Sequence, residues 1–192
     1  MKLMSSPRRW GVVMQVLHWT TALLVFGLLA VGLVMDEMAT SPTKIKVFAM
    51  HKSFGITLLA LVLLRLLWRV IDRRPKPAPM PAWQRWAARL THVGLYASVL
   101  VMAISGWLYN SASNFALKWF GLFSVPSISA PDKALKHFAH EVHETTWIVI
   151  LVLIALHVGA ALKHQLHRLP PAWPRWRRPS TGRAFRVSHR RR

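Results

Sequence analysis

The chain of 192 residues contains no cysteine and only six acidic residues. Without cysteine it cannot form a disulfide, hold an iron–sulfur cluster through thiolates, attach haem covalently, or give a thiolate to haem iron. The shortage of acids leaves a formal net charge of +20. A charge of this size suggests either a nucleic-acid partner or anionic lipid.

Long runs with little or no charge make up most of the sequence, and 53% of all residues are hydrophobic. Four runs stand out: 11–35, 47–71, 90–109 and 145–162. About twenty apolar residues cross a bilayer as a helix, so each run predicts a span, with Arg65 and Arg69 of the second reaching towards one membrane surface. The first run is too long for a secretory signal core and lacks a small-residue cleavage site. We predict an all-α, integral membrane four-helix bundle with an uncleaved first helix.

Lysine and arginine gather near alternate ends of the predicted spans. Twenty of the 26 lie at the N-terminus, between residues 65 and 89, or after residue 162, and five of the six acids lie elsewhere. The positive-inside rule therefore places both termini and the 72–89 loop in the cytoplasm. The 36–46 and 110–144 connections then lie outside.

The sequence divides into a four-span domain, residues 1–167, and a basic cytoplasmic tail, residues 168–192. Residues 73–81 are rich in proline and are expected to form a non-helical linker between spans. The tail combines arginine, proline and tryptophan, a composition that suits contact with lipid head groups or disorder better than nucleic-acid binding. We therefore expect membrane lipid, and no nucleic acid, as its partner.

Histidines occur at two matched depths of the predicted bundle. His143 and His157 are fourteen residues apart, which places them on one helix face, within about 40° and about 21 Å apart along the axis. His51 opens the second span at the outer level of His143, and His18 lies in the first span at the inner level of His157. A single histidine near a span end is commonly a hydrogen-bonded or interfacial residue, but two matched pairs favour ligation.

Paired imidazoles across a bundle are what axial coordination of haem iron requires. Because cysteine is absent, noncovalent b-type haem is the fitting form, whereas a zinc site would need four converging ligands. His92 begins the third span on the inner side and is an alternative to His18 as the partner of His157. The remaining histidines outside the spans are expected to lie in loops or the tail and to be solvated: His137, His140, His167 and His189.

Five stretches occur in a distinctive order: LHW at 17–19, HKSFG at 51–55, LVLLRLLWR at 61–69, THVGLY at 91–96 and HETTWIVILVLIALH at 143–157. Together they resemble the prokaryotic cytochrome b561 family over about residues 8–167. The resemblance implies two b-type haems, ligated by His18 with His157 and by His51 with His143, in the bacterial inner membrane. It also implies ubiquinone as electron acceptor and, from the family's studied member, oxidation of superoxide.

Two further residues are candidates for contact with a cofactor. Arg65 lies fourteen residues after His51, on the same face, where it could pair with a haem propionate or act as a positive-inside anchor. The resemblance makes His164, seven residues after His157, a candidate for contact with quinone or a propionate; interfacial placement is the alternative. Small residues permit close helix approach or make room for a macrocycle: Gly27, Gly32, Gly55 and Gly106.

Two histidines per iron fill both axial positions, so the expected chemistry is outer-sphere transfer of single electrons. Six outer lysines could steer superoxide, although outer acids nearly balance them: Lys44, Lys46, Lys52, Lys118, Lys133 and Lys136. The aromatic 110–136 connection could cover the outer site or simply rest on the membrane. The leading hypothesis is a dihaem cytochrome that exchanges electrons with quinone. The alternatives are a haem-carrying anchor for a partner dehydrogenase and a haem-free transport or scaffold protein.

Overall fold

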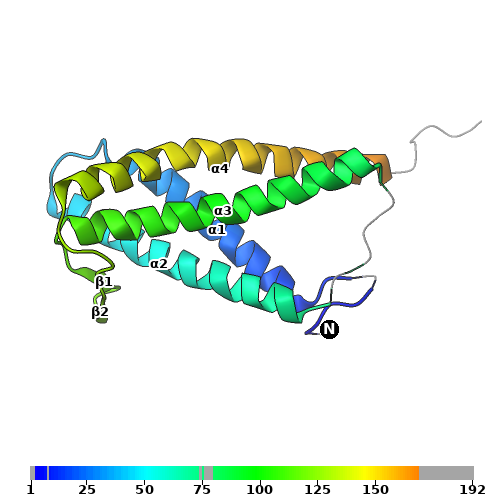
Figure 1. Ribbon diagram of the computed structural model, residues 1–192, viewed down its shortest axis with the longest axis horizontal. Coiled ribbons are helices and arrows are strands. Elements are labelled where there is room, and N and C mark those ends of the chain that lie inside the picture. The colour runs from blue at the N-terminus through cyan, green and yellow to red at the C-terminus, as the bar shows by residue number, and fades with distance from the viewer. Residues whose placement is uncertain (1–2, 8, 74, 76–79, 169–192) are drawn as a thin grey trace, which may run out of the picture.

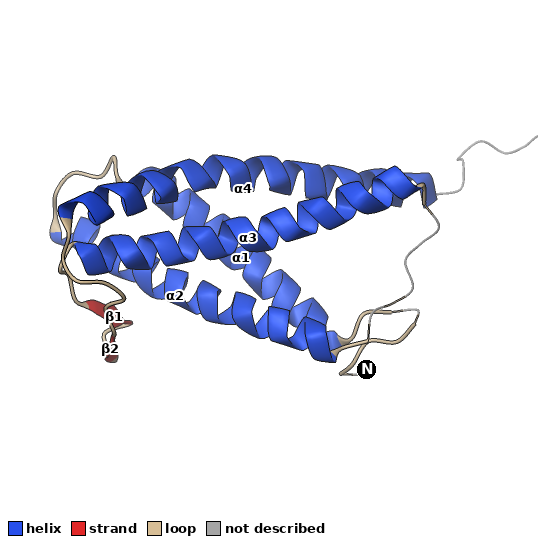
Figure 2. Cartoon of the chain, viewed as in Figure 1, coloured by secondary structure: helices blue, strands red, loops and turns tan. Residues whose placement is uncertain are grey.

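The computed structural model describes residues 3–7, 9–73, 75 and 80–168, with side chains up to residue 163. The described chain forms four long helices and one hairpin (Figures 1 and 2): α1 (Val12–Met35), α2 (Pro42–Ile71), α3 (Ala82–Ala112), β1 (Leu117–Trp119), β2 (Phe123–Val125) and α4 (Lys133–Arg168). All four helices are long and apolar enough to cross a membrane. The predicted all-α membrane bundle is therefore confirmed.

The two ends of the bundle carry different features (Figure 1). The N-terminal segment, the end of α2, the start of α3 and the end of α4 gather at one end, called the inner end below. The α1–α2 connection and the hairpin lie at the opposite, outer end. This arrangement agrees with the alternation predicted from the positive charges. The tail from residue 169 and linker residues 74 and 76–79 lie outside the described residues.

The helices extend beyond the predicted spans because polar residues cap them. Ser41 accepts a hydrogen bond from the backbone N–H of Lys44 at 3.2 Å, and Pro42 begins α2, as is common at helix N-termini. Asp132 accepts from the backbone N–H of Leu135 at 2.7 Å at the start of α4. The 110–144 connection is therefore helical from residue 133, and its placement as a loop was wrong. His137, His140 and His167 lie on α4; His189 lies outside the described residues.

A small apolar core joins three helices at mid-height. It consists of Leu58 and Val62 from α2, Val99 from α3 and Ile150 from α4. Most of the remaining apolar side chains point outward, as in Leu67, which is 59% exposed. A bilayer solvates such a surface, and each spanning helix satisfies its own backbone hydrogen bonds.

The hairpin at the outer end was not predicted. Its strands pair antiparallel, with Leu117 opposite Val125 and Trp119 opposite Phe123. Phe120 and Gly121, two of the three residues that connect the strands, have φ angles of 48° and 76°, in the left-handed region. Glycine adopts it freely, whereas phenylalanine does so at a cost. Contacts with α2 must therefore help to hold this turn.

At the inner end, the N-terminal segment is fastened to α2. The backbone N–H of Ser5 donates to the Asp72 carboxylate at 2.8 Å, and the Ser5 hydroxyl donates to the second carboxylate oxygen. The same hydroxyl accepts from the N–H of Gly11 at 2.8 Å, just before α1. Burial alone would raise the pKa of Asp72, but these hydrogen bonds outweigh it and lower the pKa. We call this group the Ser5–Asp72 clasp.

Candidate functional site

His51 and His143 face each other at the outer level. Their ring centroids are 6.4 Å apart and their planes meet at 77°. Nδ1 of His143 lies 2.8 Å from the carbonyl oxygen of Met102. A carbonyl can only accept, so Nδ1 carries the proton and donates it, which leaves the lone pair on Nε2. Ligating histidines are commonly fixed in this way by a backbone carbonyl.

Two of the predicted small residues lie against these rings. A Cβ atom placed on Gly106 would lie 2.9 Å from Cε1 of His143, and one on Gly32 would lie 3.6 Å from Cε1 of His51. The first distance is too short for any side chain larger than hydrogen. Gly106 therefore makes room for the His143 ring. Gly27 and Gly55 have no such neighbour, because nothing lies within 4 Å of an added Cβ.

A cavity of about 510 Å³ extends around the outer pair. Its walls are mainly apolar and include Leu58, Val99 and Ile150 of the core. Its volume lies within the range of about 300–1,000 Å³ that is usual for sites of small molecules and cofactors. The site thus combines apolar walls with two imidazole nitrogens that can ligate a metal ion. This combination suits a large, flat apolar cofactor with a central metal ion.

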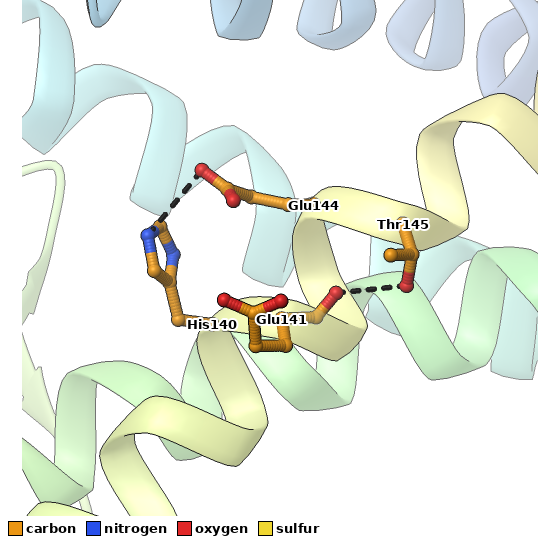
Figure 3. Close-up of polar contacts among 4 residues, drawn as sticks. All are labelled: His140, Glu141, Glu144 and Thr145. Atoms are coloured by element: carbon orange, nitrogen blue, oxygen red, sulfur yellow. Dashed lines mark hydrogen bonds and ion pairs between the residues drawn. The ribbon is translucent and has the colours of Figure 1, made fainter.

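Polar side chains of α4 also line this cavity, and Figure 3 shows their contacts. Nε2 of His140 lies 3.3 Å from Oε1 of Glu144, one helical turn further along α4. The His140 ring stacks on Tyr109 at 5.0 Å between centroids. Glu141 also lines the cavity, and its backbone carbonyl accepts from the Thr145 hydroxyl at 2.8 Å. His140 therefore lies on α4 beside Glu144 with its side chain 44% exposed, and its placement in a loop was wrong.

Three histidines meet at the inner level. The centroids of His18 and His157 are 6.2 Å apart, with planes at 71°. His92 lies closer to His157, at 5.0 Å between centroids. Nδ1 of His92 is 2.5 Å from the carbonyl oxygen of Ala88. The structure thus brings together both candidates that the sequence offered as partners of His157.

Ring spacing distinguishes the pairs. When two imidazoles bind one metal ion, each ligating nitrogen lies about 2 Å from the metal and each ring centre lies about 1 Å beyond its nitrogen. The two ring centroids are then roughly 6 Å apart. The spacings of 6.4 Å for His51 with His143 and 6.2 Å for His18 with His157 fit this value. The 5.0 Å between His92 and His157 is too short. Within the described residues, no three histidines, aspartates or glutamates are arranged to hold a bare metal ion.

The buried, unpaired polar atoms also mark these sites. Nδ1 of His18 and Nδ1 of His51 are buried without a hydrogen-bond partner in the described structure. Ile150 lies seven residues from both His143 and His157, so the apolar core separates the two levels. Buried polar atoms are normally satisfied, so these two nitrogens indicate that the sites are completed by a further group.

Arg65 lies inside the bundle near the inner level. Its Nη1 is 3.4 Å from the Thr21 hydroxyl on α1, and its Cζ is 5.3 Å from the centre of the Tyr96 ring on α3. Arg69 approaches the same ring at 5.6 Å. Nε of Arg65 and the Tyr96 hydroxyl are buried without a partner, and no described carboxylate forms an ion pair with either arginine. These two cations therefore lack a counter-ion among the described groups.

Three of the six outer lysines line a second cavity of about 640 Å³ between α2 and the segment before β1: Lys44, Lys52 and Lys118. Lys44 Nζ donates to the carbonyls of Asp36 and Met38 at 2.9 and 2.8 Å. Lys52 Nζ donates to Asn110 Oδ1 at 2.7 Å and also lines the cavity around the outer histidines. The two cavities therefore share a wall. Lys46, Lys133 and Lys136 do not line either one.

Several contacts at the site could not be read from the sequence. The Met102 carbonyl is a backbone group and leaves no signal at all. Two other residues could have been predicted from spacing. Thr21 lies one helical turn from His18 and Tyr96 one turn from His92, which places each on the same helix face as a candidate histidine. The side chain of His164 lies outside the described residues, so its predicted role stays a prediction.

The chain is similar to known proteins over most of its length. A family model described as prokaryotic cytochrome b561 matches residues 9–175. The chain is 36% identical over 168 residues to cytochrome b561 homolog 2 of Escherichia coli (strain K12), a match that covers 85% of this chain and 88% of that protein. It is 32% identical over 155 residues to cytochrome b561 homolog 1 of the same organism, with 77% and 85% covered.

Proposed function

The chain belongs to the prokaryotic cytochrome b561 family, and we propose that it holds two b-type haems, one in each histidine pair, and exchanges single electrons with membrane quinone. Membership makes it a haem-containing electron-transfer protein of the bacterial inner membrane. The two haems, their ligands and the quinone are the proposal. The domain division at residue 167 stays a prediction as well.

One observation carries the proposal: two histidine pairs on different helices have nearly the same ring spacing, 6.2 and 6.4 Å. The pairs are separated along α4 by fourteen residues, about 21 Å. His92 lies beside the inner pair, and its Nδ1 contacts the carbonyl oxygen of Ala88. In this proposal it does not ligate the metal but positions the neighbouring His157 ring. We therefore assign His18 with His157 and His51 with His143 as the axial ligands.

The groups around the outer pair hold its histidine and exclude water. Bound haem supplies reversible one-electron transfer, and two axial histidines leave no open position for oxygen. The Met102 carbonyl holds His143 in the tautomer that presents Nε2. Apolar walls exclude water and so set the potential through burial.

Arg65 supports a carboxylate ligand at the inner level. A cation inside a membrane is expensive unless an anion or dipole faces it, and neither Arg65 nor Arg69 has an ion-paired carboxylate in the described chain. Propionates of a b-type haem are carboxylates that an arginine binds with two parallel hydrogen bonds. This contact explains why Arg65 lies among three helices instead of reaching the membrane surface.

We further propose superoxide as a donor at the outer face. A small anion is attracted to a cavity lined by Lys44, Lys52 and Lys118, and such focusing raises encounter rates. The lining of this cavity contains no acid, although five acids lie elsewhere on the outer side. Because Lys52 and Leu117 line both cavities, this one leads towards the outer histidine pair.

Haem content tests the ligand assignment. Detergent-purified wild type, His18→Ala, His143→Ala, His157→Ala and His92→Ala would be compared by haem-to-protein ratio and by the spectrum after reduction with dithionite. We expect two low-spin b-type haems in the wild type and in His92→Ala, and one lost or converted in each of the other three. Loss in His92→Ala with retention in His18→Ala would instead assign His92 as the ligand. Absence of haem from the wild type would refute the proposal.

Superoxide oxidation is tested separately by quinone reduction. Purified haem-loaded protein would be mixed with superoxide and a short-chain ubiquinone at low ionic strength, and its reduction followed against a buffer control. Reduction no faster than the control would refute the superoxide proposal and leave the haem assignment standing.

A further inference from the structure

An apolar surface at the outer end is left largely uncovered by the described chain. It belongs to residues 115–125, here called the outer hairpin, which carry only one charge, at Lys118. Phe115, Leu122 and Phe123 are 63%, 75% and 57% exposed. Each Å² of apolar surface left in water costs about 25 cal/mol. A cluster of large apolar side chains on a short turn therefore calls for an apolar partner.

The outer hairpin is fixed to the membrane-spanning part of α2. Ser53, buried to 1% exposure, accepts a hydrogen bond from the N–H of Phe120 at 3.0 Å. The indole N–H of Trp119 donates to the Thr57 hydroxyl at 3.0 Å. The second predicted span begins at residue 47, and Ser53 and Thr57 lie six and ten residues inside it. The hairpin is therefore held beside the outer half of a spanning helix.

The backbone of the outer hairpin is hydrogen-bonded only in part. Its strands pair with each other across three residue pairs, and the N–H of Leu122 donates to the carbonyl of Trp119 at 2.9 Å across the turn. The outer edge of β2 has no strand partner in the described chain. An open sheet edge is excluded from the hydrocarbon, so the backbone of the hairpin suits the head-group level, where its remaining polar groups can meet water and lipid head groups. The tryptophan N–H, bound to Thr57, needs no water.

We propose that the outer hairpin lies at the head-group level of the outer leaflet, with the exposed apolar side chains of its tip, Phe120 to Phe123, reaching the lipid acyl chains. Continuity supports lipid as the partner: Phe120 packs edge-on against Phe54 of α2 at 5.0 Å, on the outside of a spanning helix. Tryptophan, present here as Trp119, is favoured at the membrane interface.

This placement has a consequence for the outer site. Leu117, at the start of β1, is buried and lines both the histidine cavity and the lysine cavity. A hairpin held in the leaflet would keep this shared wall in place. The inference rests on the fold and its membrane location, and not on which residues bind haem.

The absence of cysteine makes the test direct. A nitroxide label would be attached to Leu122→Cys in the full-length protein, reconstituted into phosphatidylcholine vesicles, and its collisions with oxygen and with a water-soluble nickel chelate measured. Leu67→Cys, on the exterior of α2, is the lipid control. Lys133→Cys, exposed at the start of α4, is the water control.

We expect the label at Leu122 to behave like that at Leu67, with an oxygen-to-nickel collision ratio severalfold above that at Lys133. A ratio equal to that at Lys133 would place the tip in water and overturn the proposal. Low collision rates with both reagents would indicate a protein cover, such as a second copy, and would also overturn it. Phe123→Cys reports on the same surface and must agree, which guards against local misfolding of one variant.

Discussion

Replacing Gly106 by alanine is predicted to damage the outer histidine site selectively. The added methyl carbon would lie 2.9 Å from Cε1 and 3.1 Å from Nδ1 of His143, so the ring must move by several tenths of an ångström. That movement also stretches the 2.8 Å hydrogen bond from Nδ1 to the Met102 carbonyl. Overpacking of this kind costs about 1–3 kcal/mol, which corresponds to roughly 5- to 150-fold weaker retention of the outer haem.

The assay is haem retention during detergent purification, with the reduced spectrum used to identify which haem is lost. Gly27→Ala is the matched control, because nothing lies within 4 Å of the added atom. Gly32→Ala, with its contact of 3.6 Å to His51, should fall between the two. If Gly106→Ala keeps both haems with unchanged spectra, like Gly27→Ala, the inference that His143 is held against this glycine is refuted.

Arg65→Gln should lower the midpoint potential of the inner haem by roughly 50–100 mV, since removing a nearby cation disfavours the added electron by about 1–2 kcal/mol. Redox titration measures the shift, with the outer haem as internal control. Equal shifts in both haems would contradict the prediction. Ser5→Ala should cost about 1–2 kcal/mol of stability at pH 7. The pKa of Asp72 is lowered in the folded protein, so its hydrogen bonds from Ser5 stabilise fully above the unfolded value of about 3.9 and contribute less as pH falls through the lower folded value. The difference in thermal unfolding between the two proteins should therefore shrink in strong acid to what the bond between the Gly11 N–H and the Ser5 hydroxyl contributes. A difference that does not change with pH would count against the clasp. Lys118→Gln should slow quinone reduction by superoxide roughly two- to threefold at low ionic strength and have little effect at about 1 M salt. A loss of rate that is the same at both salt concentrations would exclude electrostatic steering of superoxide by Lys118.

Spacing along the helices accounts for what the sequence could predict. Fourteen residues return a helical side chain to nearly the same face, so the levels of His143 and His157 followed from arithmetic alone. Uncharged length predicted the four helices, and the positive residues predicted which ends lie together. Each of these signals depends on residues within one helix or its immediate ends.

What the sequence could not supply depends on contacts between segments. The proposed preference for His18 over His92 rests on the ring spacings, since both histidines lie at the inner level, on α1 and α3. The role of Gly106 needed the approach of a second helix. The outer hairpin was missed because its strands are three residues each and Phe120 occupies a left-handed position where glycine is usual. Placing His140 in a loop failed because a capped, partly polar extension of α4 lacks the hydrophobic signal of a span.

Electron paramagnetic resonance of the oxidised wild-type protein tests the central claim most directly. Nearly perpendicular axial imidazoles leave two iron orbitals close in energy and give strongly anisotropic low-spin signals. The ring planes meet at 71° in the inner pair and 77° in the outer pair. The account predicts two such signals, each integrating to one spin per protein. A high-spin signal, a single spin per protein, or the weakly anisotropic spectrum of parallel rings would contradict it.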